Sequence, residues 1–235
     1  MSADKCYLII PASGIGSRMN SIIPKQYIAL DNGLTVIDQT LKTFLEVDSI
    51  NGCIVAISNN DSEFKSSLFS SHPKMLAIAT GGKERIHSVM SSLEKLKFIA
   101  NESDWVLVHD AVRPCIKTSD IEKLIHELKN NDTGGLLGIR TTDTVKQTNN
   151  VNFVEKTIDR SNLWQACTPQ MYRFGVLFKA LSKAIKDNFN ATDEASAIEH
   201  SSLKSQMVQC SKSNIKITTP EDIELANYYL KQGLD

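Results

Sequence analysis

A series of short apolar runs that alternate with amphipathic segments constrains the fold of this chain more than any other feature. Each run is nearly continuous in apolar residues, as strands buried on both faces are. The runs occupy residues 6–10, 53–57, 75–79, 105–109 and 135–139. Apolar residues recur at helical spacing in residues 34–45, 85–96 and 121–128. Alternating strands and helices predict an α/β fold, with an open, mostly parallel twisted sheet flanked by helices.

Two sites carry helix-start signals. Ser119 followed by Glu122 fits a capping box that would begin the last of these helices. Thr219 and Pro220 precede acidic residues, which predicts an N-cap, a proline at the first helical position and a helix that runs to about Leu230.

The segment over residues 143–158 breaks the pattern, because it has few apolar residues to give to a core. It is predicted to form two polar strands, residues 144–148 and 152–158. A lone hairpin is marginal in water, so we expect residues 141–160 to form a protruding β-arm that packs against another surface. A twofold homodimer is the commonest way to cover such a surface.

Length and charge limit the classes of fold and partner. With 235 residues, the chain is expected to form a single domain over residues 1–235. Its formal net charge of -1 supplies no overall field for holding a nucleic acid or an anionic membrane. No apolar run approaches membrane-spanning length, and the start of the chain lacks the pattern of a signal peptide. We therefore expect neither a nucleic acid nor a membrane as a partner.

The cysteine pattern indicates a reducing compartment. The five cysteines are widely spaced and form no C-x-x-C pair: Cys6, Cys53, Cys115, Cys167 and Cys210. This pattern argues against a disulfide framework and against a zinc site. It is typical of proteins of the cytoplasm, which is the location we expect.

A glycine-containing loop, P-A-S-G-I-G-S-R at residues 11–18, directly follows the first predicted strand. Glycines let the backbone approach a ligand closely, and exposed N–H groups suit phosphate. A tight strand-to-helix turn is the alternative interpretation. Met19 occupies the third glycine position of a dinucleotide fingerprint, and the Gly-Lys-Ser/Thr of a Walker A loop is absent. Arg18 and Lys25, which follows Pro24, would neutralise a triphosphate held by this loop.

A second set of polar residues follows the fourth predicted strand. Asp110 and Arg113 stand just past its end, on the side of an open parallel sheet where ligands bind. A carboxylate there can hold Mg²⁺ together with substrate phosphates; alternatively, Asp110 caps a turn and pairs with Arg113. His109 alternates with the strand valines, which indicates a structural histidine. Residues 80–82, followed by Glu84, Arg85 and Ser88, look like a second glycine loop that leads into a helix, with an ordinary turn as the alternative. Residues 192–194 look like a helix N-cap with acidic residues in the first turn.

Taken together and in order, these segments resemble the 2-C-methyl-D-erythritol 4-phosphate cytidylyltransferase family. The resemblance covers nearly the whole chain, through residues 11–18, 24–27, 109–114, 158–160, 163–164, 168–170, 192–196 and 214–216. It implies a Rossmann-like nucleotidyltransferase fold and a homodimer. It also implies transfer of CMP from CTP to 2-C-methyl-D-erythritol 4-phosphate, with Mg²⁺ as cofactor and release of pyrophosphate, in the non-mevalonate isoprenoid pathway.

The resemblance also implies the residues that do this. It assigns catalytic roles to four cations: Arg18, Lys25, Arg160 and Lys216. It assigns the metal to Asp110. It assigns substrate contacts to Ala12, Ser13, Gly14, Gly16, Gly82, Ser88, Ala111, Arg113, Thr144, Thr168 and Thr192. Gly82 and Ser88 are expected at the cytidine, and Arg160 at the methylerythritol phosphate of the neighbouring subunit.

Two other functions compete with this one. A cytidylyltransferase for another polyol phosphate, such as ribitol 5-phosphate, would share the CTP loop and differ around Thr168, Thr192 and the β-arm. A non-catalytic nucleotide-binding regulator would not need Lys25, Asp110 and Lys216 together, and all three are present. Three positions depart from the family pattern, because Ser13 stands where Ala is usual and Lys83 and Ser213 stand where Asp is common.

Overall fold

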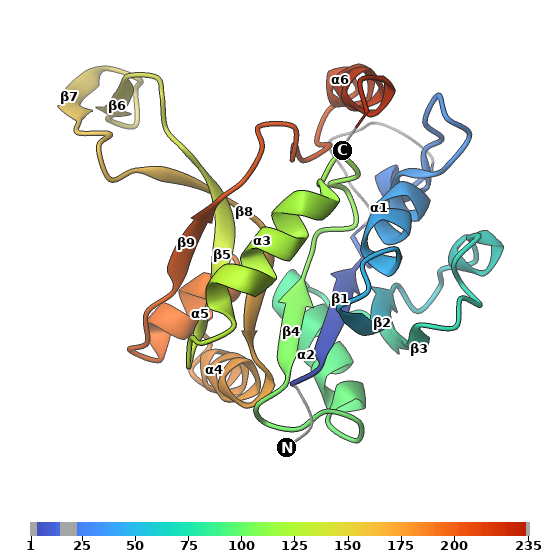
Figure 1. Cartoon of the computed structure of the whole chain (residues 1–235). Helices are drawn as coiled ribbons and strands as arrows, with labels where there is room; N and C mark the ends of the chain where they lie inside the picture. The colour runs from blue at the N-terminus through green and yellow to red at the C-terminus, as the bar shows by residue number, and fades with distance from the viewer. Residues whose placement is uncertain (1–3, 15–22, 234–235) are drawn as a thin grey trace.

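The computed structural model describes residues 4–14 and 23–233. Within these ranges, seven strands form one sheet in the order β3-β2-β1-β4-β8-β5-β9 (Figure 1). The strands are β1 (Cys6–Pro11), β2 (Ile50–Ile57), β3 (Met75–Thr80), β4 (Trp105–Val108), β5 (Gly134–Arg140), β8 (Trp164–Arg173) and β9 (Gln206–Gln209). Neighbouring strands are parallel, except that β8 runs antiparallel to both β4 and β5. The predicted mostly parallel sheet is confirmed.

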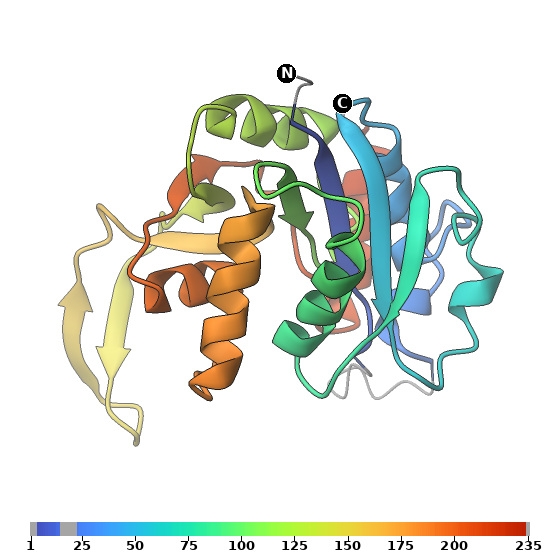
Figure 2. The same cartoon turned by 90° about the horizontal axis from the view of Figure 1, so that it is seen from below.

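Helices cover both faces of this sheet (Figure 2). They are α1 (Val36–Leu45), α2 (Arg85–Leu96), α3 (Thr118–Leu128), α4 (Phe174–Lys186), α5 (Glu194–His200) and α6 (Glu221–Lys231), with short 3-10 helices η2 (Lys25–Tyr27) and η3 (Phe64–Ser66). Phe44 of α1 and Leu124 of α3 belong to the core on one face. Leu93 of α2 and Leu181 of α4 belong to the core on the other.

Strands β8 and β9 are absent from the set of predicted strands, and β8 contains a proline. Pro169 has no N–H to donate to a neighbouring strand, which argues against a central strand. The structure accommodates it at an irregularity in the register between β5 and β8. Leu136 pairs with Gln170 and Gly138 pairs with Ala166, so three residues of β8 lie opposite one residue of β5.

The predicted capping box at the start of α3 is wrong. The helix begins at Thr118, and its N-cap, Lys117, makes no side-chain cap hydrogen bond. Ser119 therefore lies inside the first helical turn, whereas a capping side chain must come from an extended residue before the helix.

The start of α6 differs from the prediction by one residue, because Pro220 is the N-cap rather than the first helical residue. Pro220 makes no side-chain cap hydrogen bond. Asp222, in the first turn of the helix, binds the residues before it instead. A carboxylate oxygen of Asp222 accepts from the backbone N–H of Thr218 at 2.8 Å and of Thr219 at 2.9 Å. The segment before α6 is thereby tied to the helix that follows it.

The predicted hairpin is present as a separate two-stranded sheet of β6 (Val145–Thr148) and β7 (Val154–Ile158). It projects from the body of the molecule (Figures 1 and 2). Three apolar side chains around its turn are largely exposed: Val151 (69%), Phe153 (73%) and Val154 (60%). This hairpin is called the β-arm below.

Two further observations bear on the expected class of protein. All five cysteines are buried free thiols. Among the helices in residues 4–14 and 23–233, none is long and apolar enough to cross a membrane.

Candidate active site

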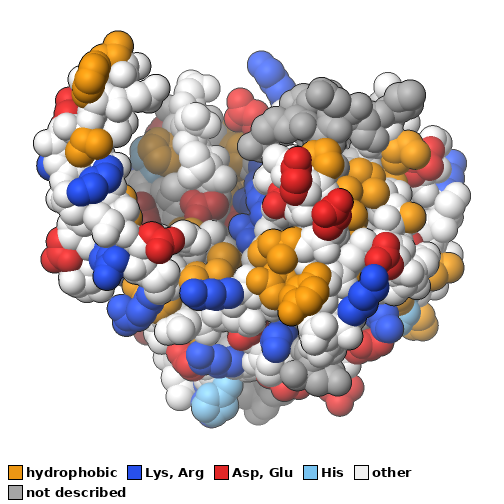
Figure 3. Space-filling model, turned by 90° about the horizontal axis from the view of Figure 1, so that it is seen from above, with side chains coloured by type: hydrophobic (Ala, Val, Ile, Leu, Met, Phe, Trp, Pro, Cys, Tyr) orange, Lys and Arg blue, Asp and Glu red, His pale blue; other side chains and the backbone are white. Residues whose placement is uncertain are grey.

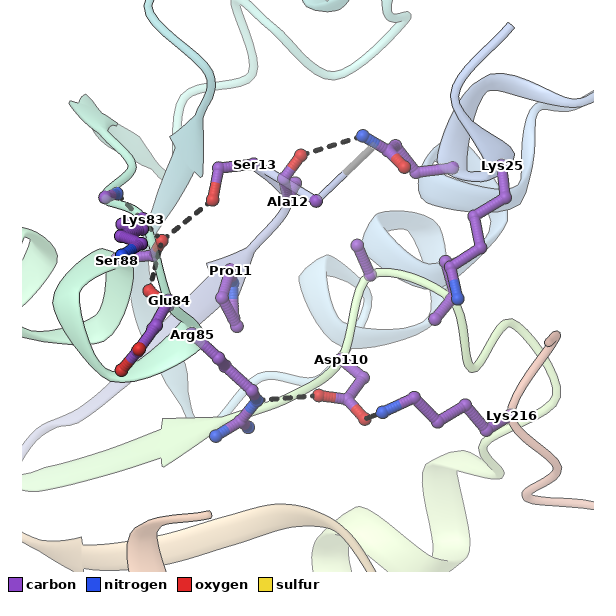
Figure 4. Close-up of a pocket in the computed structure, with 15 residues that line it drawn as sticks. Pro11, Ala12, Ser13, Lys25, Lys83, Glu84, Arg85, Ser88, Asp110 and Lys216 are labelled. Atoms are coloured by element: carbon purple, nitrogen blue, oxygen red, sulfur yellow. Dashed lines mark hydrogen bonds and ion pairs between the residues drawn. The ribbon is translucent and has the colours of Figure 1, made fainter. Parts of the chain in front are cut away.

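Most of the predicted site residues meet in a pocket at the carboxyl ends of β1 and β4 (Figure 4). Nine of them line it: Ala12, Ser13, Gly14, Lys25, Gly82, Ser88, Asp110, Ala111 and Lys216. Parallel strands bring their carboxyl ends to one edge of a sheet, and residues from separate parts of the sequence meet there for that reason. Gly16 and Arg18 lie outside the described residues.

The two glycine loops contact each other through two serines. The hydroxyl oxygens of Ser13 and Ser88 are 2.8 Å apart, and the N–H of Gly82 donates to the Ser88 hydroxyl over 3.1 Å. A Cβ added at Gly81 would lie 2.2 Å from the Ser13 Cβ, so this close approach requires glycine. A Cβ added at Gly14 would meet no described atom within 4 Å. The loops therefore form one continuous wall of the pocket.

Two lysines bring ammonium groups to the same pocket. Lys25 begins the 3-10 helix η2 directly after Pro24, so its own backbone is not extended. Its Nζ donates to the carbonyl oxygen of Ile217 over 3.2 Å, which places it beside the segment that carries Lys216. The Lys216 side chain is 39% exposed, and its Nζ lies 2.9 Å from a carboxylate oxygen of Asp110.

Three cations surround the carboxylate of Asp110, which is buried. Arg85 Nε lies 3.0 Å from Oδ1, while Lys216 Nζ and Arg113 Nε lie 2.9 and 3.5 Å from Oδ2. Burial raises the pKa of Asp110, but these three cations together hold it well below its usual range. Asp110 also begins a turn and pairs with Arg113, as the alternative interpretation of its role held. The Arg113 N–H donates to the Asp110 carbonyl over 3.1 Å. The Asp110 carboxylate is therefore ionised and has three cations beside it.

Arg85 lines both pockets, and the sequence analysis did not single it out. It starts α2, just after the second glycine loop, and Figure 4 shows its guanidinium directed at Asp110. Its Nη1 also lies 2.5 Å from Oε1 of Glu194, the first residue of α5. Burial raises the pKa of Glu194, although the Arg85 cation lowers it. The position of Arg85 after a glycine loop was the available signal, but its two partners are remote in sequence.

Thr168 and His109 fix the backbone beside Asp110. The Asp110 N–H donates to Thr168 Oγ1 over 3.1 Å, and that hydroxyl lies 3.0 Å from His109 Nδ1. His109 Nε2 lies 3.2 Å from the carbonyl oxygen of Arg113. All three contacts are satisfied when Thr168 donates to Nδ1 and the Nε2–H donates to the carbonyl. Burial lowers the pKa of His109 to about 3, so the ring is neutral and structural, as predicted.

A second pocket adjoins the first. Predicted site residues that line it are Asp110, Arg113, Thr168, Thr192 and Lys216. Asn214 ties this region together, because its carbonyl accepts from Arg113 Nη1 at 2.8 Å and its side-chain amide donates to the Thr168 carbonyl at 2.8 Å. Arg85, Asp110 and Lys216 line both pockets. Two ligands in these pockets would therefore meet at the same three side chains.

Two predicted residues are remote from both pockets within one chain. Thr144 stands just before β6 and Arg160 just after β7, on the β-arm. The Arg160 guanidinium donates to the carbonyl oxygen of Thr142. Figure 3, seen from above the view of Figure 1, shows a hollow beside the β-arm with Lys and Arg side chains along it. The fold of one chain does not bring Thr144 or Arg160 into either pocket.

Asp110 is the predicted metal ligand, and in this structure cations lie beside both of its carboxylate oxygens. Within the described part of the chain, no group of three His, Cys, Asp or Glu side chains could hold a metal ion by itself. Mg²⁺ does not need such a group, because it commonly takes one or two carboxylates and completes its coordination with phosphates and water. The Asp110 carboxylate, at the wall of the first pocket, fits that requirement.

A mostly parallel α/β sheet with two glycine loops, lysines and one carboxylate at the carboxyl ends of its strands has the architecture and the phosphate-binding groups that a nucleotidyltransferase needs. The family model for 2-C-methyl-D-erythritol 4-phosphate cytidylyltransferase matches residues 6–232 of this chain. The chain belongs to this family, which confirms the resemblance seen in the sequence.

Relatives and solved structures agree with this assignment. The chain is 58% identical over 232 residues to the 2-C-methyl-D-erythritol 4-phosphate cytidylyltransferase of Ruthia magnifica, covering 96% of this chain and 97% of the relative. It is similar to the crystal structure of the Francisella tularensis enzyme of the same name, with a TM-score of 0.82 and 41% identity over 96% of this chain and 100% of that one. A crystal structure of 4-diphosphocytidyl-2C-methyl-D-erythritol synthase gives a TM-score of 0.84 at 31% identity, over 98% of this chain and 100% of that one.

Proposed function

We propose that this chain transfers CMP from CTP to 2-C-methyl-D-erythritol 4-phosphate, giving 4-diphosphocytidyl-2-C-methyl-D-erythritol and pyrophosphate. The observation that carries the proposal is the shared wall of the two pockets, which Arg85, Asp110 and Lys216 line from both sides. The reaction joins two anionic substrates, and substrates in these two pockets would meet at that wall.

CTP would occupy the pocket between the glycine loops. Gly82, on the second loop, and Ser88, in the first turn of α2, would contact the cytidine, since both line this pocket. The backbone at Gly14 would approach the phosphates, and Lys25 would offset their charge. The loop residues Ala12, Ser13, Gly16, Arg18 and Ala111 are proposed to complete this part of the site.

Methylerythritol phosphate would occupy the adjoining pocket, beside Arg113, Thr168 and Thr192. Its phosphate monoester has a second pKa of about 6 and is mainly a dianion at neutral pH, so no general base is needed. A substrate phosphate oxygen forms a bond to the α-phosphorus, and the bond from that phosphorus to the bridging oxygen breaks. The electron pair leaves with pyrophosphate.

The protein's part in this reaction is electrostatic and geometric. Lys216, which lies between the two pockets, would leave Asp110 for the α-phosphate and stabilise the charge that develops there. Holding both substrates in line can supply roughly 7–11 kcal/mol of barrier reduction in well-oriented cases. Mg²⁺ is the proposed cofactor; Asp110 would hold it, and when bound it would neutralise phosphate charge.

The enzyme is further proposed to be a homodimer of single-domain chains in which residues 141–160 form the shared contact. The exposed apolar residues of the β-arm, Val151, Phe153 and Val154, support this, because a second chain would cover them. Thr144 and Arg160 would then reach the methylerythritol phosphate of the partner chain, where a guanidinium fork suits a phosphate group. The cytoplasm is the proposed location, and the buried free thiols support it.

The test of the function is pyrophosphate release from CTP in the presence of Mg²⁺. We expect release with 2-C-methyl-D-erythritol 4-phosphate and little with ribitol 5-phosphate at the same concentration. Preference for ribitol 5-phosphate would overturn the substrate assignment. Tight binding of CTP without pyrophosphate release from either substrate would favour the regulator instead.

A subunit-mixing experiment tests the shared site. Inactive Arg160→Ala and inactive Lys25→Ala chains are combined under conditions of demonstrated exchange. If Arg160 acts on the partner's site, a mixed dimer has one site with both lesions and one intact site, so activity returns. If Arg160 acts on its own site, each site carries one lesion and mixing restores nothing, which contradicts the shared-site proposal.

A further inference from the structure

The contact between Arg85 and Glu194 is an ion pair that protein stability does not explain. Glu194 is 1% exposed, and the desolvation of a buried carboxylate costs several kcal/mol. Among the described residues, neither Glu194 Oε2 nor Arg85 Nη2 has a hydrogen-bond partner, and both atoms are buried. Replacing such a pair by apolar residues is often neutral or stabilising. An incompletely satisfied buried pair beside a pocket indicates a role in the site.

The start of α5 holds Glu194 in place. The Gln170 side chain of β8 accepts from the Ala195 N–H at 2.8 Å and donates to the Asp193 carboxylate at 2.8 Å. Asp193 in turn caps α5 by accepting from the Ser196 N–H over 2.9 Å. Glu194 is therefore fixed to the sheet through its two neighbours, and Arg85 is fixed through Glu194.

The cations on the two oxygens of Asp110 differ in how firmly they are held. Arg85, on Oδ1, is held by Glu194 at 2.5 Å. Lys216, on Oδ2, has a side chain 39% exposed and lies where the two pockets meet. Removing Lys216 from Oδ2 leaves Asp110 with Arg85 at 3.0 Å from Oδ1 and with the more distant Arg113 at 3.5 Å from Oδ2.

We propose that Arg85, clamped by Glu194, is a positioning residue that keeps Oδ2 of Asp110 directed at the pocket while Lys216 exchanges between Asp110 and the substrate phosphate. The inference rests on the proposed function, because that function moves Lys216 to the α-phosphate. Arg85 needs no contact with either substrate in this role. It acts through Asp110, and Glu194 prevents its guanidinium from turning toward the phosphates instead.

Glu194→Gln tests this role, because the amide keeps the shape of the side chain and removes the charge that clamps Arg85. We expect kcat to fall roughly 10–100-fold, as changes to groups that orient a metal-binding carboxylate do, with a smaller change in KM for CTP. The Mg²⁺ concentration at half-maximal rate should rise. Calorimetric binding of CTP in Mg²⁺, without the second substrate, should weaken as well. Glu199→Gln, an exposed position on the same helix, is the matched control and should change none of these.

A double-mutant cycle with Lys216→Ala separates positioning from a merely structural role. If Arg85 and Glu194 act through the exchange of Lys216, the losses from Glu194→Gln and Lys216→Ala are not additive. Additive losses, or a Glu194→Gln variant with unchanged kcat and unchanged Mg²⁺ half-saturation, overturn the proposal.

Arg85→Lys decides the matter if Glu194→Gln does not fold, since an ammonium group cannot bridge two carboxylates with the fork of a guanidinium. It should show the same rise in Mg²⁺ half-saturation, and an unchanged value overturns the proposal. Failure of the proposed function is a different outcome: the unmodified enzyme then releases no pyrophosphate from CTP with methylerythritol phosphate. The positioning role fails alone when the unmodified enzyme is active and the variants match it.

Discussion

Thr168→Val is a nearly isosteric change that removes one buried hydroxyl beside the proposed metal ligand. Thr168 is 4% exposed. Its hydroxyl accepts from the Asp110 N–H at 3.1 Å and lies 3.0 Å from His109 Nδ1. Valine fills the same space without either hydrogen bond. Thr168→Val therefore removes the contacts of the Thr168 hydroxyl with Asp110 and His109 and leaves the packing around the side chain nearly unchanged.

The expected cost follows from the two groups that lose their partner. A buried polar group left without a hydrogen bond costs roughly 1–3 kcal/mol, and the Asp110 N–H and His109 Nδ1 would both be in that state. Burial of one additional methyl group offsets about 0.8 kcal/mol. Two such groups together cost roughly 2–6 kcal/mol, so with this offset we expect the free energy of unfolding to fall by about 1–5 kcal/mol. For a chain of this size each kcal/mol lowers Tm by about 2–4 °C, so Tm should fall by roughly 2–20 °C.

Urea unfolding of the two proteins, with Tm from calorimetry, measures this difference. Thr168→Ser is the control, because it keeps the hydroxyl and loses a methyl group, for which a loss of about 1 kcal/mol is expected. A Thr168→Val variant within about 0.5 kcal/mol of the unmodified protein would refute the network described around His109. Reduced stability with unchanged KM for methylerythritol phosphate would assign Thr168 to the loop of Asp110 rather than to the substrate.

Three further predictions concern the proposed chemistry and assembly. Lys25→Ala and Lys216→Ala should each lower kcat by roughly 10²–10³, by analogy with the loss of an oxyanion donor, and near-normal pyrophosphate release by a folded variant would remove that residue from the proposed role. Asp110→Asn should raise the Mg²⁺ concentration at half-maximal rate, because an amide is a poorer ligand for a hard cation; a titration with unchanged half-saturation and maximal rate would remove Asp110 from the metal site. Phe153→Ser should shift the sedimentation coefficient toward the monomer at lower protein concentration, since it reduces exposed apolar surface on the β-arm; a dimer of unchanged strength would show that this side chain is not in the interface.

The elements that depend on local pattern could be predicted from the sequence. The strands β1 to β5 coincide with continuous apolar runs. Burial on both faces explains the runs of β1 and β4. The expectation of burial on both faces is wrong for β3, which lies at the edge of the sheet and leaves Leu76 and Ile78 exposed. The β-arm could be predicted because its strands have few apolar residues, so that they cannot belong to the core and must project from it. Boundaries were less accurate: β2 begins at Ile50, three residues before the apolar run, and α3 begins without a side-chain cap. Strand β8 was not predicted. Its Pro169 cannot donate a backbone hydrogen bond, and the sheet accommodates this residue where the register between β5 and β8 is irregular.

The sequence by itself also determined the two glycine loops, Lys25, Asp110 and Lys216, because each stands in a short segment typical of the family. The tertiary structure alone decided how they act on one another. The Arg85–Glu194 contact joins residues 109 positions apart, and Lys216 meets Asp110 across a similar separation. Such contacts depend on the order of strands in the sheet, which brings the ends of β1 and β4 and the segment before α6 to one edge. A residue's neighbours in the sequence determine whether it begins a helix or ends a strand, whereas its charge partner is set by long-range packing that no local pattern records.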